Sequence, residues 1–259
     1  APFFPVIIAA WQDVYDCVGS MDIPFHQFFE ASSKFVRVVD GFGPIIGSVQ
    51  VDIVKNLDKL KKANDKYPSA KTLQSLVRAE KAAGTHQNKY GASVALLWLN
   101  REMQFIFIIL QKIVSGLNAS RAVREAYAET LSRHHGSVIR NAFEWGLSSR
   151  LTAPPSTAVI LPRFGTDTAL TIDQMDVCIG IATPVFEAIH KFLISEGLDD
   201  SCKTGTTISG EFNFEHPIQA RTNSPTSTGF DGPPDEWRQI LLSNQQDIGS
   251  HLAGSSEPA

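Results

Sequence analysis

Apolar residues recur at three- and four-residue spacing from about Pro24 to Leu198, and almost no stretch alternates as a strand would. This spacing gathers the apolar side chains on one face of a helix and predicts an all-α protein. Short connections between the segments favour a two-layer bundle of about eight helices. The clearest helical segments are residues 25–39, 45–66, 71–83, 90–117, 120–131, 134–148 and 172–197.

Composition divides the chain into three segments. Residues 1–22 begin with an apolar run that two prolines interrupt, which favours an N-terminal arm packed on the domain over a signal peptide. Residues 23–198 form the helical domain, in which three prolines mark a loop over residues 151–171. Ser, Thr, Gly and Pro dominate residues 199–259 and no apolar period survives there, so we predict a disordered tail.

Charge and cysteine content narrow the class of protein. A net charge of -4 argues against nucleic-acid binding, which usually shows as a basic face. The 3 cysteines are too few and too scattered for a disulfide framework, which favours a reducing compartment such as the cytoplasm. The most apolar stretch, residues 105–110, is flanked by polar residues, so we expect a buried helix and no membrane-spanning segment.

Signatures of enzymes and metal sites are missing from the sequence. It contains no GxSxG elbow, no HExxH and no Walker loop. His134 and His135 are adjacent, so on a helix they point about 100° apart and cannot chelate one metal ion. A lipid-modifying enzyme that used His135 with Asp52 would lack a nucleophile beside them. We therefore expect a protein that is not an enzyme and needs no cofactor.

A polar stripe interrupts one of the predicted helices. Asp52, Asn56 and Lys59 stand at positions i, i+4 and i+7 and share one face over two turns. A carboxylate, an amide and a cationic donor together suit the hydroxyl groups of a sugar ring. An ordinary solvated face with a helical ion pair explains the same spacing.

Trp98 lies in the apolar middle of the chain and permits two interpretations. It is either a core residue or an aromatic platform for the apolar face of a sugar. Arg101 follows within one turn, as a surface residue or as part of the same site. His135 stands beside Gly136 at a helix start, where it is either a hydrogen-bonded core histidine or a ligand-binding group.

Three motifs in these regions resemble the glycolipid transfer protein family, in the same order. Residues 52–59 have the D-x3-N-x2-K pattern of the family's second helix. Residues 91–101 are similar to its GA-x-x-A-L-x-W-L-x-R segment, and residues 134–136 stand in the position of its Y/H-H-G motif. The likeness covers residues 23–197.

The resemblance implies a headgroup site and a lipid pocket. The headgroup site would comprise Asp52, Asn56, Lys59, Trp98, His135 and Arg101. In it Asp52 would also bind the ceramide amide N–H, Trp98 would stack on the first sugar ring, and His135 would donate to the ceramide carbonyl. The two hydrocarbon chains would lie in a hydrophobic sleeve between the helical layers. Candidates for its lining are Phe35, Val39, Ile45, Phe105, Ile109, Phe143 and Leu147.

The implied function is the transfer of a glycosphingolipid between membranes by a cytoplasmic carrier without covalent chemistry. Asn56 and Trp98 favour a sugar headgroup, because ceramide phosphate carriers of the same superfamily have basic residues there. Arg101 leaves the alternative of a ceramide-1-phosphate carrier open. A second alternative is a sphingolipid sensor that signals through the tail, which residues 199–259 suggest by their length.

The partners expected are the lipid, a transient membrane contact and a protein bound by the tail. Family members often carry an aromatic residue directly after the H-G pair, where this chain has Ser137. Membrane contact would then use Trp145, the Phe3–Phe4 pair or the lysine-rich residues 55–71. Residues 211–215 (EFNFE) resemble acidic two-phenylalanine peptides that bind receptor proteins of the endoplasmic reticulum.

Overall fold

The computed structural model describes residues 3–20 and 22–199, in which it places nine α-helices and no strand. The prediction of an all-α protein is therefore confirmed. The helices are α1 (Phe3–Tyr15), α2 (Phe25–Phe35), α3 (Pro44–Lys66), α4 (Leu73–Ala82), α5 (Ala92–Val114), α6 (Ala119–Glu129), α7 (Ser137–Ser148), α8 (Thr157–Ile160) and α9 (Thr168–Ser195). Short 3₁₀ turns cover Val18–Ser20, Val36–Gly41, Leu131–His134 and Leu161–Arg163.

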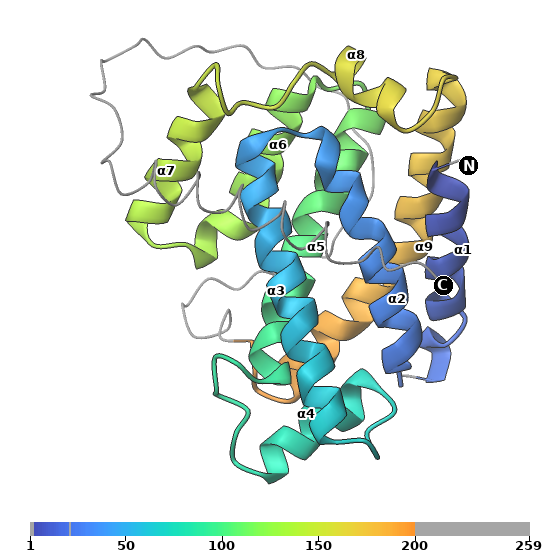
Figure 1. Ribbon diagram of the computed structural model, residues 1–259, viewed down its shortest axis with the longest axis vertical. Coiled ribbons are helices and arrows are strands. Elements are labelled where there is room, and N and C mark those ends of the chain that lie inside the picture. Colours follow the sequence, from blue (N-terminus) through green and yellow to red (C-terminus); the bar gives the residue numbers. More distant parts are fainter. Residues whose placement is uncertain (1–2, 21, 200–259) are drawn as a thin grey trace, which may run out of the picture.

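Helix α5 lies at the centre of the bundle and packs against α3, α6 and α9. In Figure 1, α2 and α3 lie in front of α5, α6 and α9, which gives the two predicted layers. Helix α1 packs against both α2 and α9, α4 packs against α5, and α7 contacts α3 and α6. Apolar residues on nearly every side of α5 make this central position favourable.

By length and hydropathy alone, helices α5 and α9 could each cross a membrane. From the sequence we expected no segment of this kind. Their surroundings explain part of the composition. In the most apolar window, 67% of α5 and 44% of α9 is buried inside the bundle, and the two helices pack against each other. Burial in the core accounts for most of the apolar window of α5 and for less than half of that of α9.

Residues 1–22, expected as an arm, contribute a helix to the core. Trp11 of α1 is 0% exposed. It packs edge-on against four phenylalanines: Phe28, Phe35, Phe107 and Phe186. Pro5 does not break α1, because it lies in the first turn, where no intrahelical partner exists for its missing N–H. Phe4 is fully buried and is not available for the predicted membrane contact, whereas Phe3 is partly buried and packs on Phe164.

The proline-rich residues 151–171 are more ordered than a plain loop. They contain α8 and a 3₁₀ turn, and α9 begins at Thr168, ahead of the predicted start. The Asp167 side chain accepts a hydrogen bond from the Leu170 backbone N–H at 3.1 Å and caps α9. Ile160 and Phe164 are buried and anchor the segment.

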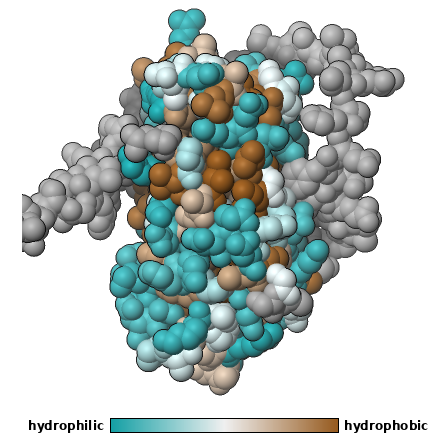
Figure 2. All heavy atoms as spheres, turned by 90° about the vertical axis from the view of Figure 1, so that its right-hand side faces the viewer, coloured by the Kyte–Doolittle hydropathy of each residue, from teal (hydrophilic) through white to brown (hydrophobic). Residues whose placement is uncertain are grey.

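Helices α1 and α9 form the face of the molecule that Figure 2 presents. Apolar side chains gather along the middle of this face. Exposed apolar residues on these two helices include Val6, which is 47% exposed, and Val177, which is 51% exposed. The predicted tail, apart from Asp199, and the tail motif at residues 211–215 lie outside the described residues.

Candidate functional site

The polar stripe of α3 faces α5 through a buried amide. Asn56 is 5% exposed, and its Nδ2 lies 3.1 and 3.2 Å from the two carboxyl oxygens of Glu102. The Lys59 Nζ donates to the Asn56 Oδ1 at 3.0 Å. Asp52, one turn before Asn56, reaches solvent at the edge of this cluster. The structure therefore brings the three predicted residues together and orients the amide from both ends.

Glu102 belongs to this cluster and was not predicted. It is 6% exposed, and burial is the main cause that raises its pKa to about 8. The negative charge of Asp52 raises the pKa of Glu102 further, while the Asn56 hydrogen bond and the Lys59 charge oppose the shift. Burial also raises the pKa of Asp52. A sequence signal did exist, because Glu102 lies one turn beyond Trp98 inside a strongly apolar helix.

We expect the buried acid to make stability depend on pH. A raised pKa means that the folded state holds the Glu102 proton more tightly than the unfolded chain. The free energy of unfolding should therefore fall by roughly 3 kcal/mol from this group as the pH rises from about 5 to 8. In Glu102→Gln this loss should disappear, as measured by urea unfolding at several pH values.

The matched control for this experiment is Glu129→Gln, which alters a solvent-exposed carboxylate on α6. It should leave the pH dependence of the wild-type protein in place. Other titrating groups contribute equally to wild type and variants, so the difference between the curves isolates Glu102. Parallel curves for wild type and Glu102→Gln would contradict the prediction.

Trp98 is half-buried, and two other predicted headgroup residues meet at its ring. The His135 imidazole stacks on Trp98 with 6.0 Å between ring centroids and 19° between planes. The Arg101 guanidinium lies over the Trp98 ring at 5.2 Å from its centroid. His134 approaches the ring edge-on at 6.4 Å, and burial is the main cause that lowers its pKa to about 4.

His135 connects this platform to the interior. Its Nδ1 lies 2.9 Å from the hydroxyl oxygen of Tyr127. Burial lowers the pKa of His135 and raises the pKa of Tyr127 to about 12, so both are uncharged at neutral pH. Tyr127 in turn stacks on Phe143 at 3.9 Å and meets Phe105 edge-on at 6.3 Å. A continuous row of rings therefore runs from Trp98 to two candidate sleeve residues.

Arg101 is held by a residue that follows helix α9 in the chain. Its Nη2 donates to the Oδ1 of Asp199 at 2.8 Å, and the other carboxylate oxygen of Asp199 lies 3.2 Å from the His190 Nδ1. The Asp199 side chain is only 2% exposed. We expected Asp199 to begin the disordered tail, but it packs into the domain because it pairs with Arg101, about a hundred residues earlier.

The seven candidate sleeve residues all belong to the hydrophobic core. Their exposed fractions range from 0% to 6%: Phe35, Val39, Ile45, Phe105, Ile109, Phe143 and Leu147. Gly146 lets α7 approach α3 closely, because a Cβ there would lie 2.5 Å from the Ile45 Cδ1. These side chains pack against neighbouring core residues, so the sleeve stays a prediction.

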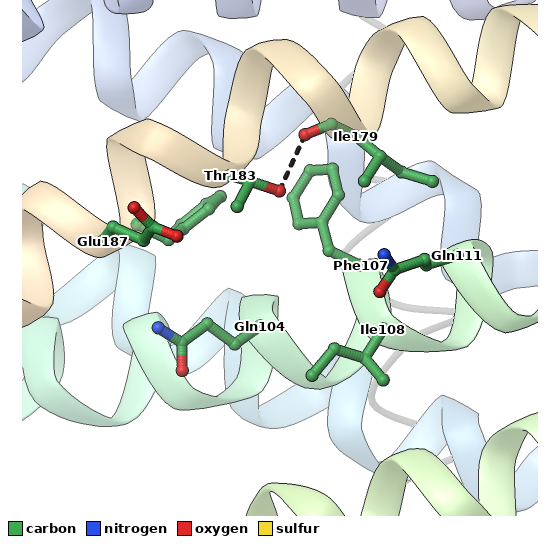
Figure 3. A pocket seen from close by; sticks show the side chains of 8 residues that line it. Gln104, Phe107, Ile108, Gln111, Ile179, Thr183 and Glu187 are labelled. Carbon is green, nitrogen blue, oxygen red and sulfur yellow. Dashed lines mark hydrogen bonds between the residues drawn. The ribbon is translucent and has the colours of Figure 1, made fainter. Parts of the chain in front are cut away.

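The described residues enclose two hollows, and none of these seven side chains lines either of them. One, of about 30 Å³, lies between α5 and α9, where Phe107 is surrounded by polar and apolar groups of both helices (Figure 3). The Thr183 hydroxyl at its edge donates to the Ile179 carbonyl oxygen at 2.8 Å. The other, of about 390 Å³, lies between α1 and α2. Within residues 3–20 and 22–199, no three His, Cys, Asp or Glu side chains are grouped so that they could hold a metal ion.

Comparison with known sequences finds a matching family model and several similar proteins. The family model described as Glycolipid transfer protein (GLTP) matches residues 23–157. The human pleckstrin homology domain-containing family A member 8 is 33% identical over 151 residues, which cover 56% of this chain and 28% of the relative. A glycolipid transfer protein of Aureobasidium melanogenum is 29% identical over 198 residues, which cover 75% of this chain and 94% of the relative. The chain spans 28–38% of the length of the first curated relatives that it matches.

Solved structures share the fold at lower identity. A point mutant of Arabidopsis ACD11, complexed with C12 ceramide-1-phosphate, superposes with a TM-score of 0.69 at 22% identity, over 77% of this chain and 98% of that one. FAPP2, described as selecting simple glycosphingolipids using the GLTP fold, superposes with a TM-score of 0.65 at 24% identity, over 77% of this chain and 98% of that one. Because the family model spans more than half of the sequence, the chain belongs to the glycolipid transfer protein family.

Proposed function

We propose that this chain carries one glycosphingolipid at a time between membranes and catalyses no covalent reaction. The observation that supports this most is the junction at α5, where the polar cluster of Asn56 and Glu102 and the Trp98 platform adjoin a row of buried rings. A site that is polar at one end and apolar at the other suits an amphipathic ligand. The ligands named for FAPP2 and ACD11, simple glycosphingolipids and ceramide-1-phosphate, are of this kind.

The headgroup would be held by charged and uncharged hydrogen-bonding groups and by one aromatic ring. Asp52 reaches solvent, so its carboxylate can accept from a sugar hydroxyl or an amide N–H without leaving the surface. Asn56 and Lys59 supply donors beside it. Trp98 supplies the aromatic face, and the Glu102 carboxyl, uncharged at neutral pH, offers a donor and an acceptor.

His135 would bind the ceramide carbonyl. In the arrangement we propose, the Tyr127 hydroxyl donates to the His135 Nδ1, which fixes the ring proton on Nε2. That N–H is then the donor for the carbonyl oxygen. Uncharged histidine suits this task, because the ligand amide is neutral and burying a charged ring beside it would be costly.

The hydrocarbon chains would supply affinity and the polar groups selectivity. Burying a methylene gains about 0.8 kcal/mol whatever the headgroup is. Polar groups left without partners penalise a wrong headgroup, which is why a few of them decide specificity. Because Phe143 and Leu147 of α7 pack tightly on the core, the chains would enter by displacing α7 from α3.

Membrane contact would be peripheral and would take place at the start of α7. Val138 is 63% exposed and Ile139 43% exposed, and both follow Ser137, the residue after the His135–Gly136 pair. Apolar side chains at this place could insert among lipids next to the headgroup site. We place the carrier in the cytoplasm, where its thiols would stay reduced.

The test is fluorescence-detected transfer of labelled galactosylceramide between vesicles, with labelled ceramide-1-phosphate in parallel. Asp52→Val should slow galactosylceramide transfer about tenfold, because a bound hydroxyl or amide would lose its charged acceptor. Asp58→Val is the matched control, since Asp58 is an exposed acid of the same helix that pairs with Lys62. It should leave the rate unchanged.

The other outcomes distinguish the alternatives. Transfer of the phosphate lipid without the sugar lipid would make the chain a ceramide-1-phosphate carrier. Lipid that co-purifies but does not move between vesicles would favour the sensor, for which removal of residues 200–259 should change the response. Product formed on incubation with galactosylceramide would contradict a carrier that performs no chemistry.

A further inference from the structure

Arg101 is the residue of the site best suited to a phosphate, yet its guanidinium is already engaged. A guanidinium presents a planar array of donors that matches phosphate oxygens. Arg101 lies over the Trp98 ring, which is where a headgroup would be bound. Its Nη2 is taken by Asp199, and its Nε is buried without a hydrogen-bond partner among the described residues. The residue that could recognise a phosphate therefore has an internal partner.

Asp199 is built into the fold as this partner. Its side chain is 2% exposed and its second carboxylate oxygen lies 3.2 Å from His190 of α9. A phosphate headgroup would have to draw Arg101 away from a buried carboxylate with which it forms an ion pair, which is unfavourable. A sugar headgroup makes no such demand, because its hydroxyl groups can be bound by Asn56 and Glu102 without disturbing the ion pair.

We propose that Asp199 is a specificity-determining residue, which pairs with Arg101 and thereby restricts the site to uncharged sugar headgroups and excludes phosphate monoesters. Asp199 acts through Arg101 and is a positioning residue that does not itself touch the lipid. It lies outside residues 23–157, so the element that sets selectivity is supplied by the chain after α9. This inference rests on the proposed function.

The experiment measures transfer of labelled galactosylceramide and labelled ceramide-1-phosphate between phosphatidylcholine vesicles by the full chain. Asp199→Asn keeps the shape of the side chain and removes its charge. We expect the ratio of the phosphate lipid rate to the sugar lipid rate to rise about tenfold, since a released guanidinium can make charge-assisted hydrogen bonds to phosphate. Adding Arg101→Gln to the same chain should abolish this gain.

Glu196→Gln is the matched control. Glu196 is the C-terminal neighbour of α9 and forms ion pairs with Arg78 and Lys81 at 2.9 and 2.7 Å. Its substitution removes an acid from the same end of the chain without touching Arg101. The ratio of the two rates should stay at the wild-type value. Thermal melting of each variant establishes that the rates compare folded proteins.

Two results would overturn the inference. One is an unchanged ratio in folded Asp199→Asn. The other is a selective loss of ceramide-1-phosphate transfer in Arg101→Gln, which would mean that Arg101 already binds phosphate in the wild-type protein. This second test does not depend on whether Asp199→Asn folds. Failure of the proposed function looks different, because the wild-type chain would then move neither lipid. Binding of the two lipids at equilibrium would still report the effect of Asp199.

Discussion

Trp98→Ala should slow galactosylceramide transfer by roughly tenfold to a hundredfold, the largest loss of activity that we expect from one substitution. The ring would supply apolar contact area to the sugar and, beyond that area, an aromatic contribution of about 0.5–1.5 kcal/mol. It also supports two other site residues, since His135 stacks on it and Arg101 lies over it. Removing Trp98 therefore disturbs the positions of groups that remain.

Initial rates of vesicle-to-vesicle transfer measure this effect. Trp98→Phe keeps a ring and should retain most of the activity, which separates the platform from the indole N–H. Tyr90→Ala removes an aromatic side chain that is 66% exposed just before α5, and it should have no effect. If folded Trp98→Ala transfers galactosylceramide as fast as Trp98→Phe, the Trp98 ring is not a platform for the headgroup.

Trp11→Ala should lower the free energy of unfolding by about 3–5 kcal/mol, the range for deleting a large buried aromatic side chain. The Trp11 ring is 0% exposed and meets Phe186 at 5.1 Å and Phe28 at 6.0 Å between centroids. Its loss would open a cavity among α1, α2, α5 and α9, which α1 cannot fill by itself. The free energy of unfolding of a domain is typically about 5–15 kcal/mol, so the loss of Trp11 would remove a large part of it.

Urea unfolding followed by circular dichroism gives the measurement. Tyr15→Ala, at the end of the same helix and 42% exposed, is the control and should cost much less. Equal stabilities of Trp11→Ala and Tyr15→Ala would mean that α1 is an arm that the bundle does not need. A large difference would show that the domain starts before residue 23, where the family match begins.

The candidate headgroup site contains buried polar groups that do not increase the stability of the protein. A buried carboxyl such as Glu102 lowers stability when it ionises, and a buried ion pair such as Arg101–Asp199 often adds little. Glu102 contacts the polar stripe of α3, and Arg101 lies over the Trp98 ring. Buried polar groups in such a place are most easily explained by selection among headgroups.

Local patterns along the chain determined most of the helices. The three- and four-residue apolar period located α2 to α7 and α9 within a few residues, because helix formation depends on neighbours three and four positions apart. The same rule placed Asp52, Asn56 and Lys59 on one face before any contact was known. The sequence did not reveal helix α1, because Pro5 is compatible both with the first turn of a helix and with a break in one, and only the helix boundary distinguishes the two.

Only the tertiary structure decided which polar residues meet. Glu102 joins Asn56 across 46 positions and Asp199 joins Arg101 across 98, and no spacing rule reaches that far. Burial is likewise a property of the assembled bundle, so the raised pKa of Glu102 and the inclusion of Asp199 in the domain follow from packing. The sequence by itself determined which helices form and which faces they bury, and the bundle decided which side chains the headgroup site contains.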